Sequence, residues 1–179
     1  EALIEIYEKL RPGEPATLDS SKNQIITRFF DEFRYDLARV GRYKFNRKLN
    51  VADRLLDQTL AENITDENGE VVFEKGTKIT KANLEELKTV LAKGFGVKEV
   101  TINEELDTYN KVQIVKIYDP SDKKKKIAVV GNDQEIDVKR LTISDVYASV
   151  SYYLNLLQGV GNFDEIDHLG NRRIRQVGE

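Results

Sequence analysis

The chain has 179 residues, of which 40% are hydrophobic and 33% are charged, and its formal net charge is −3 at pH 7. This length and composition predict a soluble, charge-rich globular chain with one fair-sized domain or two small ones. The absence of cysteine excludes disulfides and thiol chemistry, and the single histidine leaves almost no scope for a zinc site. No apolar run of about 18 residues exists and nothing resembles a signal peptide, so we expect a cytoplasmic chain with no membrane partner.

The first 56 residues are predicted to be helical. Leu3, Ile6, Tyr7 and Leu10 have helical spacing, and a Pro- and Gly-containing break follows at residues 11–15. A second helix is expected to begin between Thr17 and Ser20, which offer capping oxygens, and to bury the apolar pairs at residues 25–26 and 29–30. Residues 34–48 then predict a basic, aromatic loop.

Residues 57–140 change to the shorter period of strands and carry more acidic than basic side chains. A hairpin is expected at residues 64–73, turning at Asn68-Gly69, and a helix from Thr80 to Lys93 with Gly94 as its stop. Strands are predicted at 97–102, 112–118 and 127–130, with a turn at 119–122. The four lysines at 123–126 predict a solvated hairpin tip, with attraction to a DNA duplex as the minor alternative. This segment is interpreted as an inserted β-rich module.

The helical pattern returns at residues 141–179. Thr142 and Asp145 have the spacing of a capping box. An apolar stripe follows at Ile143, Val146, Tyr147, Val150, Leu154 and Leu157, and Gly159 and Gly161 end it. We therefore predict an α+β fold: a discontinuous helical domain, 1–56 plus 141–179, that carries the β-rich module 57–140.

Two clusters of charged residues are candidate sites. Residues 34–48 hold six Lys or Arg and one acid among aromatic side chains, a composition that fits either a solvated loop or nucleic-acid contact. Near the C-terminus, Asp164, Glu165 and Asp167 precede Arg172, Arg173 and Arg175. Two interpretations of these acids are possible: they pair with the arginines, or they hold Mg²⁺. Pairing is the favoured interpretation. His168 is interpreted as a residue that bonds the loop backbone, because no nucleophile lies near it.

Three blocks of the sequence resemble bacterial RNA polymerase β subunits, in the same order. They are residues 1–15, residues 29–49, which include Val40-Gly41-Arg42-Tyr43-Lys44-Phe45-Asn46-Arg47, and residues 161–179. The resemblance implies that the chain is part of the lobe of the β subunit, up to its junction with the protrusion. The lack of methionine and the start at Glu1, within a helical pattern, also predict an excised piece of a longer protein.

The resemblance further implies that this piece of a nucleotidyltransferase contacts non-template DNA without catalysing the reaction. In the family, the segment matching residues 39–47 is a gate loop, which meets a transcription elongation factor and implies DNA contacts for Arg42 and Lys44. Asp167 and Arg172 match residues that bind a flipped non-template guanine, and Arg175 is expected to support that pocket. No cofactor is expected here, since another subunit binds the catalytic Mg²⁺.

The implied partners are the β′ and α subunits, a sigma factor, the elongation factor and DNA, in the cytoplasm close to the nucleoid. A free-standing adaptor that binds proteins through its arginine-rich end is the rival interpretation. The missing methionine and the end of the chain at Gly178-Glu179, within the third resembling block, favour the polymerase interpretation over the adaptor.

Overall fold

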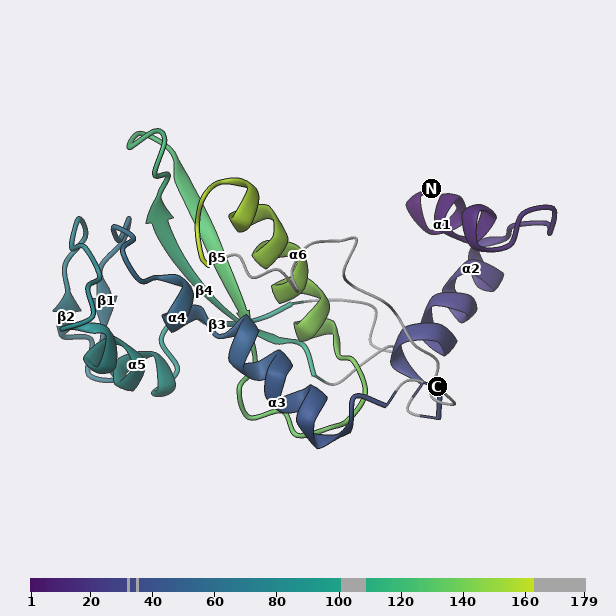
Figure 1. Ribbon diagram of the computed structural model, residues 1–179, viewed down its shortest axis with the longest axis horizontal. Coiled ribbons are helices and arrows are strands. Elements are labelled where there is room, and N and C mark those ends of the chain that lie inside the picture. Colours follow the sequence, from purple (N-terminus) through teal and green to yellow (C-terminus); the bar gives the residue numbers. More distant parts are fainter. Residues whose placement is uncertain (32, 35, 101–108, 163–179) are drawn as a thin grey trace. The chain divides into compact units, whose positions relative to one another are not determined.

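The computed structural model describes residues 1–31, 33–34, 36–100 and 109–162 (Figure 1). The fold class is α+β, as predicted, with helices and small antiparallel sheets. Two compact units are present: Glu1–Arg42 with Asp137–Leu141, and Tyr43–Ile136 with residues 142–162. The predicted domain boundaries at residues 56 and 140 stay a prediction. Among the residues that the structure describes, no helix has both the length and the apolar character to cross a membrane.

The first unit contains the two predicted N-terminal helices. Helix α1 (Ala2–Leu10) buries Tyr7, whose hydroxyl donates a 2.9 Å hydrogen bond to Glu14. This bond raises the pKa of Tyr7 and lowers the pKa of Glu14, which also accepts from Arg11. Helix α2 (Leu18–Ile25) begins with a reciprocal capping box, as Thr17 accepts from the Ser20 amide and donates its own amide to the Ser20 hydroxyl. A π-helical turn, η1 (Ile26–Phe30), continues it with half-buried apolar side chains.

The second unit is built on a three-stranded antiparallel sheet in the order β3-β4-β5. Its strands are β3 (Val97–Glu99), β4 (Lys111–Tyr118) and β5 (Lys126–Asn132). Val115 lies opposite Val129 and Ile117 opposite Ile127, so these four side chains share one face of the pleat. They are buried against α4 (Val51–Arg54), α5 (Leu84–Ala92) and the hairpin of β1 (Ile64–Thr65) and β2 (Val71–Phe73), which complete the main core.

The hairpin and the following helix confirm most of the local predictions. Gly69 adopts a φ of +84°, as the Asn-Gly turn requires, and Gly94 ends α5 with a φ of +99°. The predicted start of α5 was wrong. The Asn83 side chain accepts from the Thr80 amide at 2.7 Å, which holds residues 80–83 in a turn, so the helix begins at Leu84.

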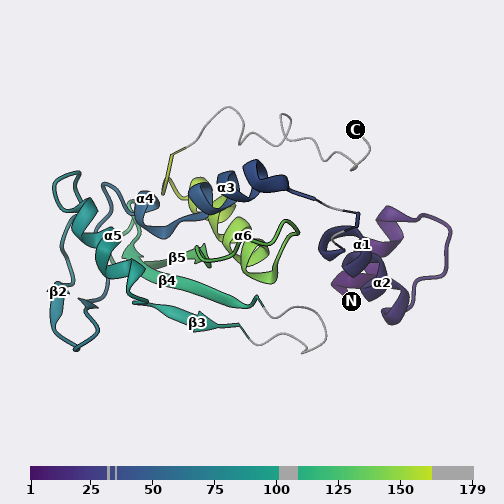
Figure 2. The same cartoon turned by 90° about the horizontal axis from the view of Figure 1, so that it is seen from below.

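Helix α6 (Ile143–Leu157) begins at the predicted capping box of Thr142 and Asp145. Its orientation is unusual for an amphipathic helix, because the buried side includes Ser144, Asp145 and Asn155. Ala148 and Tyr152 also face inward and pack with Leu49 of helix α3 (Ala38–Leu49) in a second, small core. Most of the predicted apolar stripe is therefore exposed and faces away from the core. The helix itself lies beside β5 (Figure 2).

Polar side chains of α6 bond the edge of β5 that has no neighbouring strand. Ser151 accepts from the Val130 amide at 3.0 Å, and Asn155 donates to the Ala128 carbonyl at 3.3 Å. Ser144 accepts from the Asp133 amide at 2.8 Å. An edge strand needs such partners because its outward amides and carbonyls are otherwise unsatisfied.

Arg54 is the charged member of this contact. Its guanidinium donates to the Val130 carbonyl at 2.7 Å and to the Asn155 side chain, and it lies 5.3 Å from the ring centroid of Tyr152. The residue is only 4% exposed, and burial lowers its pKa to about 10. Hydrogen bonds and the aromatic ring thus stabilise a buried cation.

We predict that Asn155→Ala lowers the free energy of unfolding by roughly 1–3 kcal/mol, since it removes one hydrogen-bond acceptor of the Arg54 guanidinium and the side-chain donor to the Ala128 carbonyl. Urea denaturation followed by circular dichroism measures the change. Gln158→Ala, at an exposed position of the same helix end, is the control and is expected to stay within about 0.5 kcal/mol. Equal effects of the two substitutions would contradict the role of Asn155.

Candidate nucleic-acid interface

The basic segment is helical, which corrects the predicted loop at residues 34–48. Helix α3 covers Ala38–Leu49, and the Asp36 carboxylate accepts from the Ala38 amide at 2.6 Å just before it. Gly41 sits inside the helix, where a Cβ would lie 3.1 Å from the Leu37 Cβ. The glycine therefore serves close packing, and the basic side chains are presented by a regular helix.

Arg42 is buried, with 4% of its surface exposed. Its Nε donates to the Val138 carbonyl at 2.7 Å, and a terminal nitrogen donates to the Arg140 carbonyl at 2.5 Å. The Leu37 amide donates to the Lys139 carbonyl at 2.7 Å beside these bonds. In this arrangement Arg42 fastens residues 137–141 to the start of α3. A phosphate would reach its guanidinium only if these bonds were exchanged, so its DNA contact stays a prediction.

The second half of α3 presents an exposed basic face. Tyr43, Lys44 and Arg47 are exposed, and residues 43–49 contain no acidic side chain. Cations on one helix face attract phosphates, and an exposed tyrosine offers a ring on which an unpaired base can stack. Lys44, predicted from the resemblance, thus lies on a surface open to solvent.

A buried polar network holds this half of α3 in place. Asn46 donates to the Ile136 carbonyl at 3.0 Å and accepts from the Asn132 side chain at 3.1 Å. Asn132 also donates to Asp145 at 2.8 Å, and Asp145 accepts from the Thr142 hydroxyl at 2.9 Å. Asn46 therefore connects α3 to β5 and, through Asn132, to the first turn of α6.

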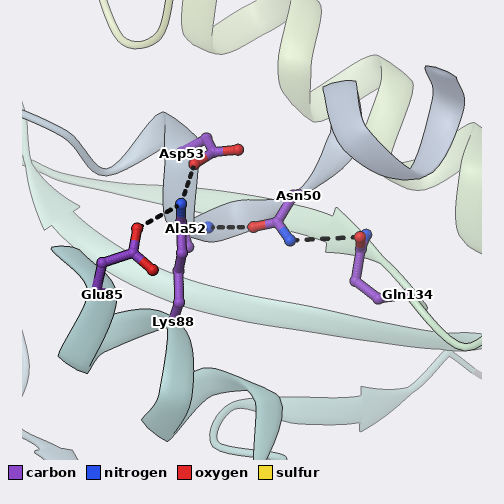
Figure 3. A network of polar contacts seen from close by, with 6 residues as sticks. All are labelled: Asn50, Ala52, Asp53, Glu85, Lys88 and Gln134. Atoms are coloured by element: carbon purple, nitrogen blue, oxygen red, sulfur yellow. Dashed lines mark hydrogen bonds and ion pairs between the residues drawn. The ribbon is translucent and has the colours of Figure 1, made fainter. Parts of the chain in front are cut away.

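A second group of polar contacts surrounds α4 and includes an ion pair between α4 and α5 (Figure 3). Asn50 caps α4 by accepting from the Ala52 amide at 2.7 Å, and it donates to Gln134 at 3.3 Å. Lys88 of α5 lies 3.1 Å from Glu85 and 3.2 Å from Asp53. The hydrogen bonds that Lys88 donates to Glu85 and, with a smaller effect, to Asp53 raise the pKa of Lys88. These contacts fix the base of α4, which leads directly from α3.

The other predicted site residues, Asp167, Arg172 and Arg175, lie outside the described residues, as do Asp164, Glu165 and His168. Within the described ranges, no group of three His, Cys, Asp or Glu side chains is placed to hold a metal ion. Sequence reasoning missed Arg54 and its partners. The available signal was the polar row Ser144, Ser151 and Asn155 along α6, which is unusual for the buried side of a helix.

A basic helix face held by buried polar networks is the arrangement of a binding module for nucleic acid or protein. The chain belongs to the family of RNA polymerase Rpb2, domain 2, whose model matches residues 1–64 and 95–175. The proteins that it resembles are named DNA-directed RNA polymerase subunit beta. The chain is 52% identical to that of Geobacillus thermodenitrificans and 49% identical to that of Listeria innocua, with 99% of the chain aligned in each case. The chain is 48% identical to that of Enterococcus faecium, with 100% of the chain aligned.

The chain spans 15% of the length of each of these relatives. Residues 65–94, which the family model leaves out, contain β2 and α5. These two elements nevertheless contribute Phe73, Leu87 and Leu91 to the main core. They are therefore integral to the second unit.

We predict that Arg42→Met accelerates hydrogen exchange at the Leu37 amide, because residues 137–141 lose two bonds from a charged donor, worth roughly 1.5–3 kcal/mol each. Exchange measured by NMR reports this opening. Lys44→Met removes a solvent-exposed cation two residues further along and serves as the control. Unchanged protection of Leu37 in Arg42→Met would contradict the fastening role.

Proposed function

We propose that this chain forms part of the DNA cleft of a bacterial DNA-directed RNA polymerase, as part of the β subunit, and contacts the non-template strand without catalysing the reaction itself. The observation that supports this function most directly is the family membership, together with near-complete alignment to proteins of that name. The exposed basic face of α3 adds a surface suited to a nucleic-acid backbone.

The proposed chemistry of DNA contact has two parts. Lys44, with Arg47 and Tyr43 on the same half of α3, attracts phosphates and offers an aromatic ring to an unpaired base. Asp167 accepts hydrogen bonds from the N1 and N2 donors of a flipped guanine, while Arg172 donates to its O6 or to a phosphate. Arg175 supports this pocket. Arg42 acts with them either as a direct contact or by holding the start of α3.

In this proposal the chain works only within the assembled enzyme. Its partners are the β′ and α subunits, a sigma factor, and an elongation factor that meets α3, in the cytoplasm near the nucleoid. The catalytic Mg²⁺ belongs to another subunit, so no residue of this chain is assigned a step in nucleotide addition. Within the described residues no contact favours the adaptor interpretation, whose arginine-rich end lies outside them.

The decisive experiment introduces Asp167→Ala into a full-length β subunit carrying this sequence, assembled into polymerase. We expect the lifetime of complexes with guanine at the first downstream non-template position to lose its advantage over thymine, by roughly 1–3 kcal/mol for one good base contact. Asp164→Ala removes a neighbouring carboxylate and is the matched control. An unchanged preference for guanine would make Asp167 a structural partner of the arginines.

A second prediction concerns the exposed face of α3. Lys44→Ala is expected to weaken DNA complexes uniformly across sequences and to reduce the salt slope of log K by about 0.7, the value for one phosphate on a single strand. The salt dependence of binding by assembled polymerase measures it. Lys75→Ala, at an exposed turn after β2, is the control. The same slope in both variants would remove Lys44 from the DNA contact.

A further inference from the structure

The outward side of α6 is an apolar surface. Val146, Tyr147, Val150, Leu154 and Leu157, here called the α6 stripe, are each 41–69% exposed. Their spacing places them along one side of the helix. A helix of a soluble protein normally turns such a stripe toward a core, yet the inward side of α6 is occupied by the polar residues that bond β5.

The same helix lacks the charges that a water-facing helix carries. No Asp, Glu, Lys or Arg occurs from Val146 to Phe163, in a chain of which 33% is charged. An exposed helix surface without charge gains little from hydration, whereas its apolar side chains gain free energy when they are covered. Both exposure and composition therefore indicate that the α6 stripe is covered in the working protein.

A groove of about 520 Å³ runs between this surface and β5. Its lining includes Ala128, Val130, Tyr147 and Leu154, so it suits an apolar segment. The charged groups at the groove, among the described residues, are both positive. Lys126 is the charged residue in its lining, and the buried Arg54 guanidinium bonds Asn155 from below. An acidic side chain on the occupant would complement this positive potential.

We propose that the α6 stripe and its groove are an interface within the β subunit, occupied by an apolar segment of the same polypeptide that lies outside these 179 residues and carries an acidic side chain near Lys126. The curated relatives are far longer, since the chain spans 15% of their length. A tethered segment meets the groove at a high effective concentration, which a second copy or another protein lacks. The proposal is independent of any DNA contact.

The test uses a full-length β subunit carrying this sequence, assembled into polymerase without DNA. Photoreactive p-benzoylphenylalanine replaces Tyr147, which preserves an aromatic side chain in the groove, and in a second variant replaces Val71, which is 50% exposed on β2. After irradiation, mass spectrometry identifies the linked peptides. We expect Tyr147 to link to a distant peptide of the same subunit with at least about ten-fold higher yield than Val71, as a buried interface requires.

Two outcomes would overturn the proposal: linkage at the level of the Val71 control, or linkage to a second copy or another protein.

Charge reversal then tests the acidic side chain of the occupant. Lys126→Glu is expected to increase hydroxyl-radical labelling of the α6 stripe by roughly two-fold or more, because it opposes a complementary carboxylate. Lys124→Glu, at the exposed hairpin tip, leaves that labelling unchanged. Equal labelling in the two variants would refute the acidic side chain. Since the readout involves no DNA, these results stay separable from the proposed DNA contacts.

Discussion

The outer edge of β5 is the constraint on which the second unit depends. Strand order places β5 at the end of the sheet, so the Val130 amide and the carbonyls of Ala128 and Val130 have no neighbouring strand. A further strand would satisfy them and would also invite aggregation. Side chains satisfy them instead, with Ser151 and Asn155 contributed by α6 and Arg54 by α4. These outward groups of β5 are therefore hydrogen-bonded and do not offer a pairing site to a strand of another chain.

These side-chain hydrogen bonds to the edge of β5 determine the orientation of α6. They also require the burial of a charged group, which is unfavourable. Polar residues face β5, so most of the large apolar side chains of the helix face outward, and the Arg54 guanidinium is buried beside Asn155. Burial lowers the pKa of Arg54 to about 10, because a site removed from water disfavours the charged form. The same contact thus creates both the small core with α3 and the apolar surface that we assign to the rest of the subunit. In the proposed interface, α6 therefore has two roles: its inward side stabilises the second unit, and its outward side contacts another segment of the subunit.

Local sequence signals predicted most elements well because they act over a few residues. The capping boxes at Thr17 and Thr142, the Asn68-Gly69 turn and the stop at Gly94 are satisfied by neighbours in the chain. The predicted loop at residues 34–48 was wrong because its basic and aromatic composition was given more weight than helical periodicity, and α3 covers Ala38–Leu49. The DNA-contact roles of Asp167, Arg172 and Arg175 rest on resemblance, and nothing in the described residues tests them.

By itself, the sequence determined the α+β class, the family and the places where helices and strands start and turn, because short-range sterics and hydrogen bonds decide these. Only the tertiary structure decided which side of each element is buried. The structure shows that partners roughly 90 residues away in the sequence engage the side chains of Arg42 and Asn46, while the DNA contact of Arg42 stays a prediction. Buried polar groups need hydrogen-bond partners, and the tertiary structure can supply these from distant parts of the chain. The spacing of residues along the sequence does not reveal which distant groups will meet.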